Sequence, residues 1–91
     1  GYIIIQRKQV SFMLKLKNIK KSNGIISADY DPECSGEIGR ISINIDSGKE
    51  VETTISLMDR EFPIYLNHAL DILRKIKDEK DIPEEKLVMW Y

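Results

Sequence analysis

Apolar and polar residues alternate along residues 14–57, and this period is typical of β-strands that are buried on one face. In the first segment, residues 14–20, leucines alternate with lysines. Three further segments, residues 25–30, 37–45 and 50–57, continue the pattern. The positions expected to face inward in these three are Ile26, Ala28, Tyr30, Ile41, Ile43, Ile45, Val51, Thr53, Ile55 and Leu57. The pattern therefore predicts four strands, each with one apolar face.

Turn signals separate these segments. Asn23 and Gly24 form the strongest short hairpin signal, because both residues tolerate the positive φ of a type I′ turn. Residues 31–36 contain a proline and a Ser-Gly pair, and residues 46–49 read Asp-Ser-Gly-Lys. Gly39 stands where the phase of the isoleucines shifts, so we expect a β-bulge there. Short links of this kind predict an antiparallel meander.

The apolar face of such a sheet requires a cover, and residues 60–79 have the period of an amphipathic helix. The stripe comprises Phe62, Tyr65, Leu66, Ala69, Leu73 and Ile76, with Leu70 and Ile72 at its edges. Asp59 is the expected N-cap, and Pro63 is compatible only with the first turn. Residues 87–91 are apolar and aromatic, and are either a last strand or a tail packed on the core. The predicted fold is a two-layer α+β sandwich in which a C-terminal helix covers one face of an antiparallel four-stranded meander, ββββα with an optional final short strand.

The first residues differ from the rest. The segment that begins at Met13 is a good native start for a strand. Residues 1–12 are therefore interpreted as an N-terminal extension, either non-native or an extra strand. The β-branched and aromatic content of residues 2–5 supports the extra strand. Residues 13–91 are expected to form a single α+β domain, since 91 residues suffice for one domain and not for two.

The net charge of −1 conceals a strong segregation of charge along the chain. Residues 1–28 carry a net charge of +6, residues 29–61 carry −6, and residues 62–91 carry −1. One interpretation is that basic and acidic strands compensate each other within one sheet. The other is contact with a polyanion through basic residues of the first strand. The candidates for that contact are Lys15, Lys17, Lys20 and Lys21.

The sequence largely lacks residue combinations that are typical of catalytic sites. Cys34 is the only cysteine and His68 the only histidine, so an internal disulfide is excluded and a zinc site is disfavoured. Nothing in the sequence places the two residues together, and we expect His68 to be a partly exposed helix residue. The acidic residues within 29–33 could collect a divalent cation, but a solvated turn explains them better. We therefore predict no enzyme, no metal and no cofactor.

The expected location is cytoplasmic, without membrane association, because no apolar run approaches the length of a membrane span. The favoured function is a small non-catalytic protein-interaction or regulatory module. A homodimer through an edge strand or through the C-terminal tail is expected to be one form of the interaction. The candidate interface residues are Leu87, Met89, Trp90 and Tyr91, because exposed aromatic side chains are useful at interfaces.

The alternative is a module that binds single-stranded DNA or RNA weakly through the basic N-terminal strands. The ββββα order is similar to that of Whirly-type single-stranded DNA-binding proteins, and the similarity is one of element order alone. Such proteins stack bases on aromatic side chains. The outward positions of residues 40–56 hold no aromatic residue and are not basic, which counts against this alternative.

Overall fold

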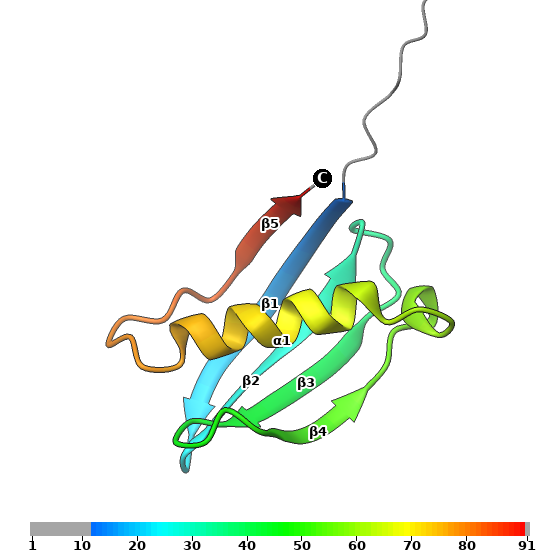
Figure 1. The fold of residues 1–91 in the computed structure, drawn as a ribbon. Helices are drawn as coiled ribbons and strands as arrows, with labels where there is room; N and C mark the ends of the chain where they lie inside the picture. The colour runs from blue at the N-terminus through cyan, green and yellow to red at the C-terminus, as the bar shows by residue number, and fades with distance from the viewer. Residues whose placement is uncertain (1–11, 91) are drawn as a thin grey trace, which may run out of the picture.

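The structure is a computed structural model that describes residues 12–90, and these residues form one antiparallel five-stranded sheet with one α-helix on one face (Figure 1). The strand order is β4-β3-β2-β1-β5. The elements are β1 (Phe12–Ser22), β2 (Ile25–Pro32), β3 (Gly39–Asn44), β4 (Glu50–Thr54), the 3₁₀ turn η1 (Leu57–Asp59), α1 (Ile64–Ile76) and β5 (Lys86–Trp90). The α+β meander is confirmed, and the optional final strand forms. The interpretation of residues 1–12 falls outside the described residues except for Phe12, which begins β1.

The hairpin turns follow the sequence signals. Asn23 and Gly24 have φ values of 52° and 77°, as a two-residue type I′ turn between Ser22 and Ile25 requires. At the β3–β4 hairpin Gly48 has a φ of 75° and donates its N–H to the carbonyl of Asn44 at 2.8 Å. Both turns set the register of the strands that they join.

The bulge expected at Gly39 is wrong. Gly39 pairs regularly with Tyr30, and a Cβ atom at this position would clash with the tyrosine ring, so glycine is present to accommodate the ring. The register of β1 against β2 shifts instead between Lys17 and Lys20, where Asn18 has a φ of 53°.

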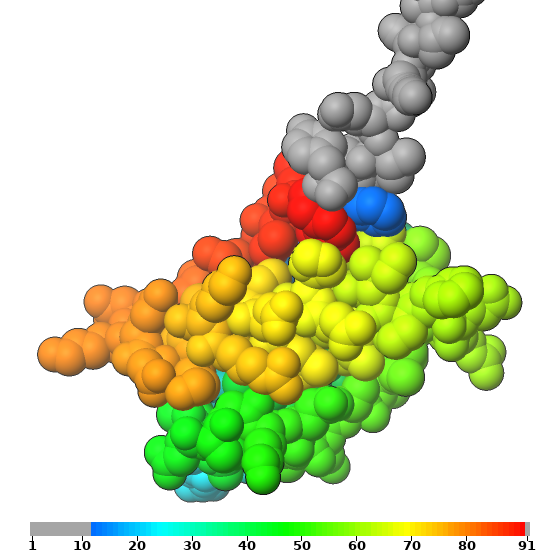
Figure 2. All heavy atoms as spheres, in the orientation of Figure 1, coloured from blue at the N-terminus to red at the C-terminus, as the bar shows by residue number. Residues whose placement is uncertain are grey.

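The core lies between α1 and β1, β2 and β3 (Figure 2 shows the helix across the front of the molecule). Its buried apolar residues are Leu14, Leu16, Ile19, Ile26, Ala28, Tyr30, Ile41, Ile43, Leu66, Ala69, Leu70, Ile72, Leu73 and Ile76. The predicted helix stripe is thus confirmed from Leu66 to Ile76. Phe62 is an exception, because α1 begins only at Ile64 and leaves Phe62 73% exposed.

The burial expected for the fourth strand is wrong. β4 ends at Thr54, so Ile55 and Leu57 lie beyond the strand, and both are largely exposed. Val51 is also 47% exposed, at the point where the β3–β4 register shifts. Because α1 packs on β1 to β3, the edge strand lacks the cover that its apolar residues would need.

None of the helical segments within residues 12–90 has the length and apolar character that crossing a membrane requires.

Candidate interaction surfaces

β5 divides its side chains between two faces. Val88 and Trp90 pack against the core, whereas Leu87 and Met89 point away from it and are 56% and 59% exposed. The C-terminal segment is therefore core on one face and exposed apolar surface on the other. Tyr91 lies outside the described residues.

An aromatic cluster holds β5 in place. The Trp90 ring stacks on Phe12 at a centroid distance of 5.5 Å and on His68 at 3.8 Å, and it meets the edge of Tyr65 at 5.8 Å. The three partners come from β1 and α1, so Trp90 ties β5 to both layers. His68 is partly exposed in the middle of α1, as expected from the sequence.

A second apolar surface lies between β4 and α1, where the chain passes through η1. Leu57, Met58, Phe62 and Ile64 are all exposed there and, together with Tyr65, Arg60 and Glu61, line a depression of about 440 Å³. We call the four exposed apolar residues the apolar corner. The sequence placed Leu57 and Phe62 in the core, and it gave no signal for Met58 or Ile64.

A buried polar network shapes this corner. The Tyr30 hydroxyl donates to Oδ2 of Asp59 at 3.0 Å and accepts the N–H of Ser56 at 3.0 Å. Tyr30, Ser56 and Asp59 are fully buried. Burial, reinforced by the Asp59 carboxylate, raises the pKa of Tyr30 to about 12. The network connects β2 to the segment that leads into α1.

Asp59 is not the N-cap residue that the sequence predicted, because it ends η1 and residues 60–63 lie between it and the helix. Its carboxylate nevertheless reaches the first turn of α1. Oδ1 accepts the N–H of Tyr65 at 3.1 Å, and Oδ2 accepts the N–H of Leu66 at 2.7 Å. Since Pro63 has no side-chain cap to offer, Asp59 takes over the capping role from a distance.

Tyr65 links this region to the start of β1. Its hydroxyl donates to Oε2 of Glu33 at 2.8 Å, and the same oxygen accepts the N–H of Met13 at 2.9 Å. Burial, together with this carboxylate, raises the pKa of Tyr65 to about 12. The start of β1 and the start of α1 are thus joined through one carboxylate.

The acidic stretch of residues 29–33 is not the solvated turn expected from the sequence, because β2 continues to Pro32 and Asp31 is buried. Asp29 bonds to Arg40 at 2.6 Å, and Asp31 accepts the N–H of Gly36 at 3.0 Å. Within residues 12–90 no group of three or more His, Cys, Asp and Glu side chains is arranged to hold a metal ion.

The basic residues of β1 have partners inside the fold. Lys15 lies 3.4 Å from Glu85, and Lys17 lies 3.7 Å from Asp31. Lys21 donates from Nζ to the carbonyl of Glu79 at 2.9 Å, while Lys20 is exposed. Three of the four lysines proposed for polyanion contact therefore have partners inside the fold, and Lys17 with Asp31 is a basic and acidic pair on neighbouring strands.

The two candidate reactive side chains occupy different elements. Cys34 is exposed in the turn after β2, where its φ is 51°, and His68 lies in α1 against Trp90. The ring of His68 is stacked rather than directed at a nucleophile. This arrangement offers no pairing of a thiol with a base.

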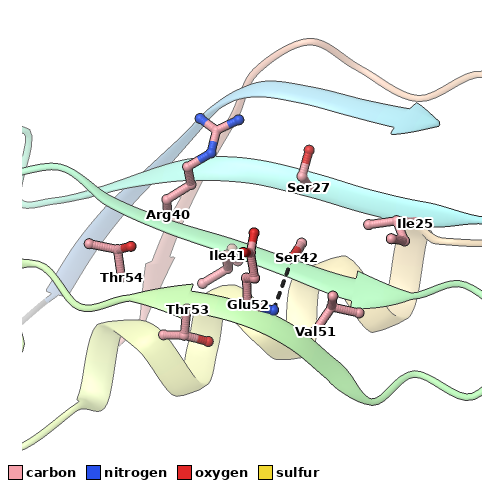
Figure 3. Close-up of a pocket in the computed structure, with 9 residues that line it drawn as sticks. All are labelled: Ile25, Ser27, Arg40, Ile41, Ser42, Val51, Glu52, Thr53 and Thr54. Atoms are coloured by element: carbon pink, nitrogen blue, oxygen red, sulfur yellow. Dashed lines mark hydrogen bonds between the residues drawn. The ribbon is translucent and has the colours of Figure 1, made fainter. Parts of the chain in front are cut away.

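The uncovered face of the sheet has a depression of about 360 Å³ over β2, β3 and β4 (Figure 3). Ser27, Arg40 and Ser42 project from this face, and the Ser42 hydroxyl accepts the N–H of Glu52 at 3.2 Å where the register shifts. Arg40 is already paired with Asp29. The lining is a mixture of hydroxyl, apolar and charged groups without the apolar concentration of the corner.

No protein-family model, curated protein or solved structure matches this chain. Exposed apolar side chains gather at two places among residues 12–90, the apolar corner and the outward face of β5.

Proposed function

We propose that this chain is a small non-catalytic protein-interaction or regulatory module. The apolar corner is the observation that carries the proposal, since Leu57 and Phe62 are 61% and 73% exposed beside a depression. Large apolar side chains gathered on a protein surface typically mark an interaction site. The buried network of Asp59 and Tyr30 holds the corner in one conformation, so binding would require little ordering of the site.

The proposed partners are protein chains. At the apolar corner the partner is a segment of another protein that presents two or three apolar side chains. Arg60 and Glu61 flank the depression, so an acidic and a basic residue on that segment would complement them. At the other side of the sheet the partner is a second copy of this chain, bound through edge strand β5 and the C-terminal residues.

Selection of peptides from a random library displayed on phage tests the corner. We expect recovered peptides to carry recurring apolar positions, and calorimetry should show that Phe62→Asp weakens them by at least about tenfold. Leu87→Asp is the matched control, because Leu87 is similarly exposed on β5 and its replacement should leave the peptide affinities unchanged. Peptides that bind Phe62→Asp as tightly as wild type, or a failure to recover any peptide, would contradict the proposal.

Weak binding of single-stranded nucleic acid is the second candidate, and exposed Lys20 together with the basic composition of β1 favours it. Non-specific association of this kind should be no tighter than about 10⁻⁴–10⁻⁶ M at physiological salt. Fluorescence anisotropy with a labelled oligonucleotide measures it. Nanomolar affinity that is lost when Lys15, Lys17 and Lys20 become Gln would place nucleic-acid binding ahead of protein interaction.

A cytoplasmic location is part of the proposal. Cys34 is the only cysteine of the chain and is exposed, and a free, accessible thiol suits a reducing compartment.

A further inference from the structure

The direction of the backbone groups in β1 shows which backbone groups of β5 point away from β1. Met13 donates its N–H to the Glu33 carboxylate and accepts the Glu33 N–H at its carbonyl, so both of its backbone groups face β2. Backbone groups alternate between the two sides of a strand. Those of Leu14 therefore face β5, where Leu14 is paired with Val88.

It follows that Leu87 and Met89 direct their N–H and C=O groups away from β1, to the outer edge of the sheet. Among the described residues no strand pairs with that edge. Both residues also carry exposed apolar side chains, on the face of the sheet opposite α1. A short strand with free backbone groups and exposed apolar side chains is a template for pairing with another chain.

We propose that a second copy of this chain pairs antiparallel with β5 about a twofold axis at Val88. This inference rests on the self-association included in the proposed function and names its geometry. The axis places Leu87 opposite the partner's Met89, and Met89 opposite the partner's Leu87. Each such pair exchanges two backbone hydrogen bonds, so the free groups of both residues are satisfied.

The side chains suit this register on both faces. On the outer face, the axis brings the exposed Leu87 and Met89 of the two copies into one apolar cluster. On the inner face, Lys86 comes opposite the partner's Trp90, where the aliphatic part of the lysine side chain can lie along the rim of the indole ring. Val88 meets the partner's Val88 on the axis itself.

The same pairing would be less favourable at the opposite edge of the sheet, which is formed by β4. A twofold axis at Val51 of β4 would place Glu50 opposite the partner's Glu52, and like charges directly opposite each other are destabilising. The shift of register between β3 and β4 also distorts that edge. The two edges therefore differ, and β5 is the edge that accepts a second copy.

Sedimentation of the full chain over a concentration series tests the self-association. The contact is small compared with a stable interface of about 1,600 Å², so we expect a dissociation constant weaker than about a micromolar. Leu87→Pro removes only an outward N–H, and Met89→Lys adds a charge beside the axis. Each variant should therefore sediment as a monomer. Val51→Lys on β4 is the matched control and should dimerise like wild type. A monomeric wild-type chain at millimolar concentration would overturn the self-association itself.

Oxidative cross-linking in a Cys34→Ser background tests the register separately. Val88→Cys should cross-link to itself, because residues opposite each other at the axis have Cα atoms about 4.5 Å apart. Leu87→Cys and Met89→Cys should cross-link efficiently when the two variants are mixed and poorly when each is alone. A dimer that forms without these cross-links, or a series of larger polymers, would overturn the proposed register while leaving self-association in place.

Discussion

Removal of the Asp59 carboxylate should be among the most destabilising single changes in the chain. The side chain is fully buried and accepts hydrogen bonds from the Tyr30 hydroxyl and from the N–H groups of Tyr65 and Leu66. Asp59→Ala leaves three donors without this acceptor, two of them buried, and the loss at each buried donor costs about 1–3 kcal/mol. Water that enters the vacated space will satisfy part of the deficit. We therefore expect Asp59→Ala to lower the free energy of unfolding by about 3–5 kcal/mol.

Urea denaturation monitored by circular dichroism measures this loss. Asp59→Asn should cost less, about 1–3 kcal/mol, because its amide oxygen can replace Oδ2 while its NH₂ group faces the N–H of Tyr65. Asp71→Ala, on the exposed side of α1, should remain within about 0.5 kcal/mol of wild type. An Asp59→Ala variant within about 1 kcal/mol of wild type would refute the capping role assigned to this carboxylate.

Three further substitutions test the core, the buried tyrosine and the aromatic cluster. Leu73→Ala should cost about 2–5 kcal/mol in urea denaturation, whereas Lys75→Ala should cost at most about 0.5 kcal/mol; equal losses would contradict the assigned helix face. Because the folded chain raises the pKa of Tyr30 from 10.0 to about 12, its contribution is complete below pH 10 and is lost as the pH rises to 12. Wild type should lose about 2–3 kcal/mol over this interval from Tyr30, a loss that Tyr30→Phe should not show in alkaline titrations of stability. Trp90→Ala should cost about 2–4 kcal/mol through its lost ring contacts, and Leu87→Ala on the other face of β5 much less; similar thermal shifts for both would argue against the packing described for β5.

Much of the fold could be predicted because its determinants are local. Alternation along residues 14–45 reports directly which side chains face the core, and Asn23 with Gly24 specifies its turn through backbone conformation alone. β4 shows where this reasoning ends. Val51 and Ile55 continue the apolar alternation, but whether they are buried depends on how far α1 extends across the sheet, and a pattern within one strand contains no such information.

The apolar corner could not be predicted for a related reason. Leu57 fits the period of the strand and Phe62 fits the period of the helix, but β4 ends before Leu57 and α1 begins only after Phe62. The transition is set by the buried contacts of Ser56 and Asp59 with Tyr30, which lies 26 and 29 residues away in the sequence. The candidate interface residues of β5 were accessible to sequence reasoning, because an apolar terminal segment is conspicuous. The side chains of Val88 and Trp90 face the core, and those of Leu87 and Met89 face solvent. This difference follows from the pairing of β5 with β1, which the sequence of the segment does not reveal.

The positions of the two surfaces determine how they would work together. The apolar corner follows β4, at one edge of the sheet, and the proposed self-association uses β5, at the other edge. Pairing through β5 therefore leaves the apolar corner of each copy uncovered, and the two β4 strands become the outer edges of a continuous sheet. With neighbouring strands about 4.8 Å apart, the two β4 strands would be separated by about 40–50 Å. A dimer of this shape can engage two sites on one partner, or bridge two partners, and a weak contact at each corner then yields a much stronger combined interaction. Weak self-association through β5 would make that gain dependent on the concentration of the chain, which is a physical basis for regulation without any catalytic group.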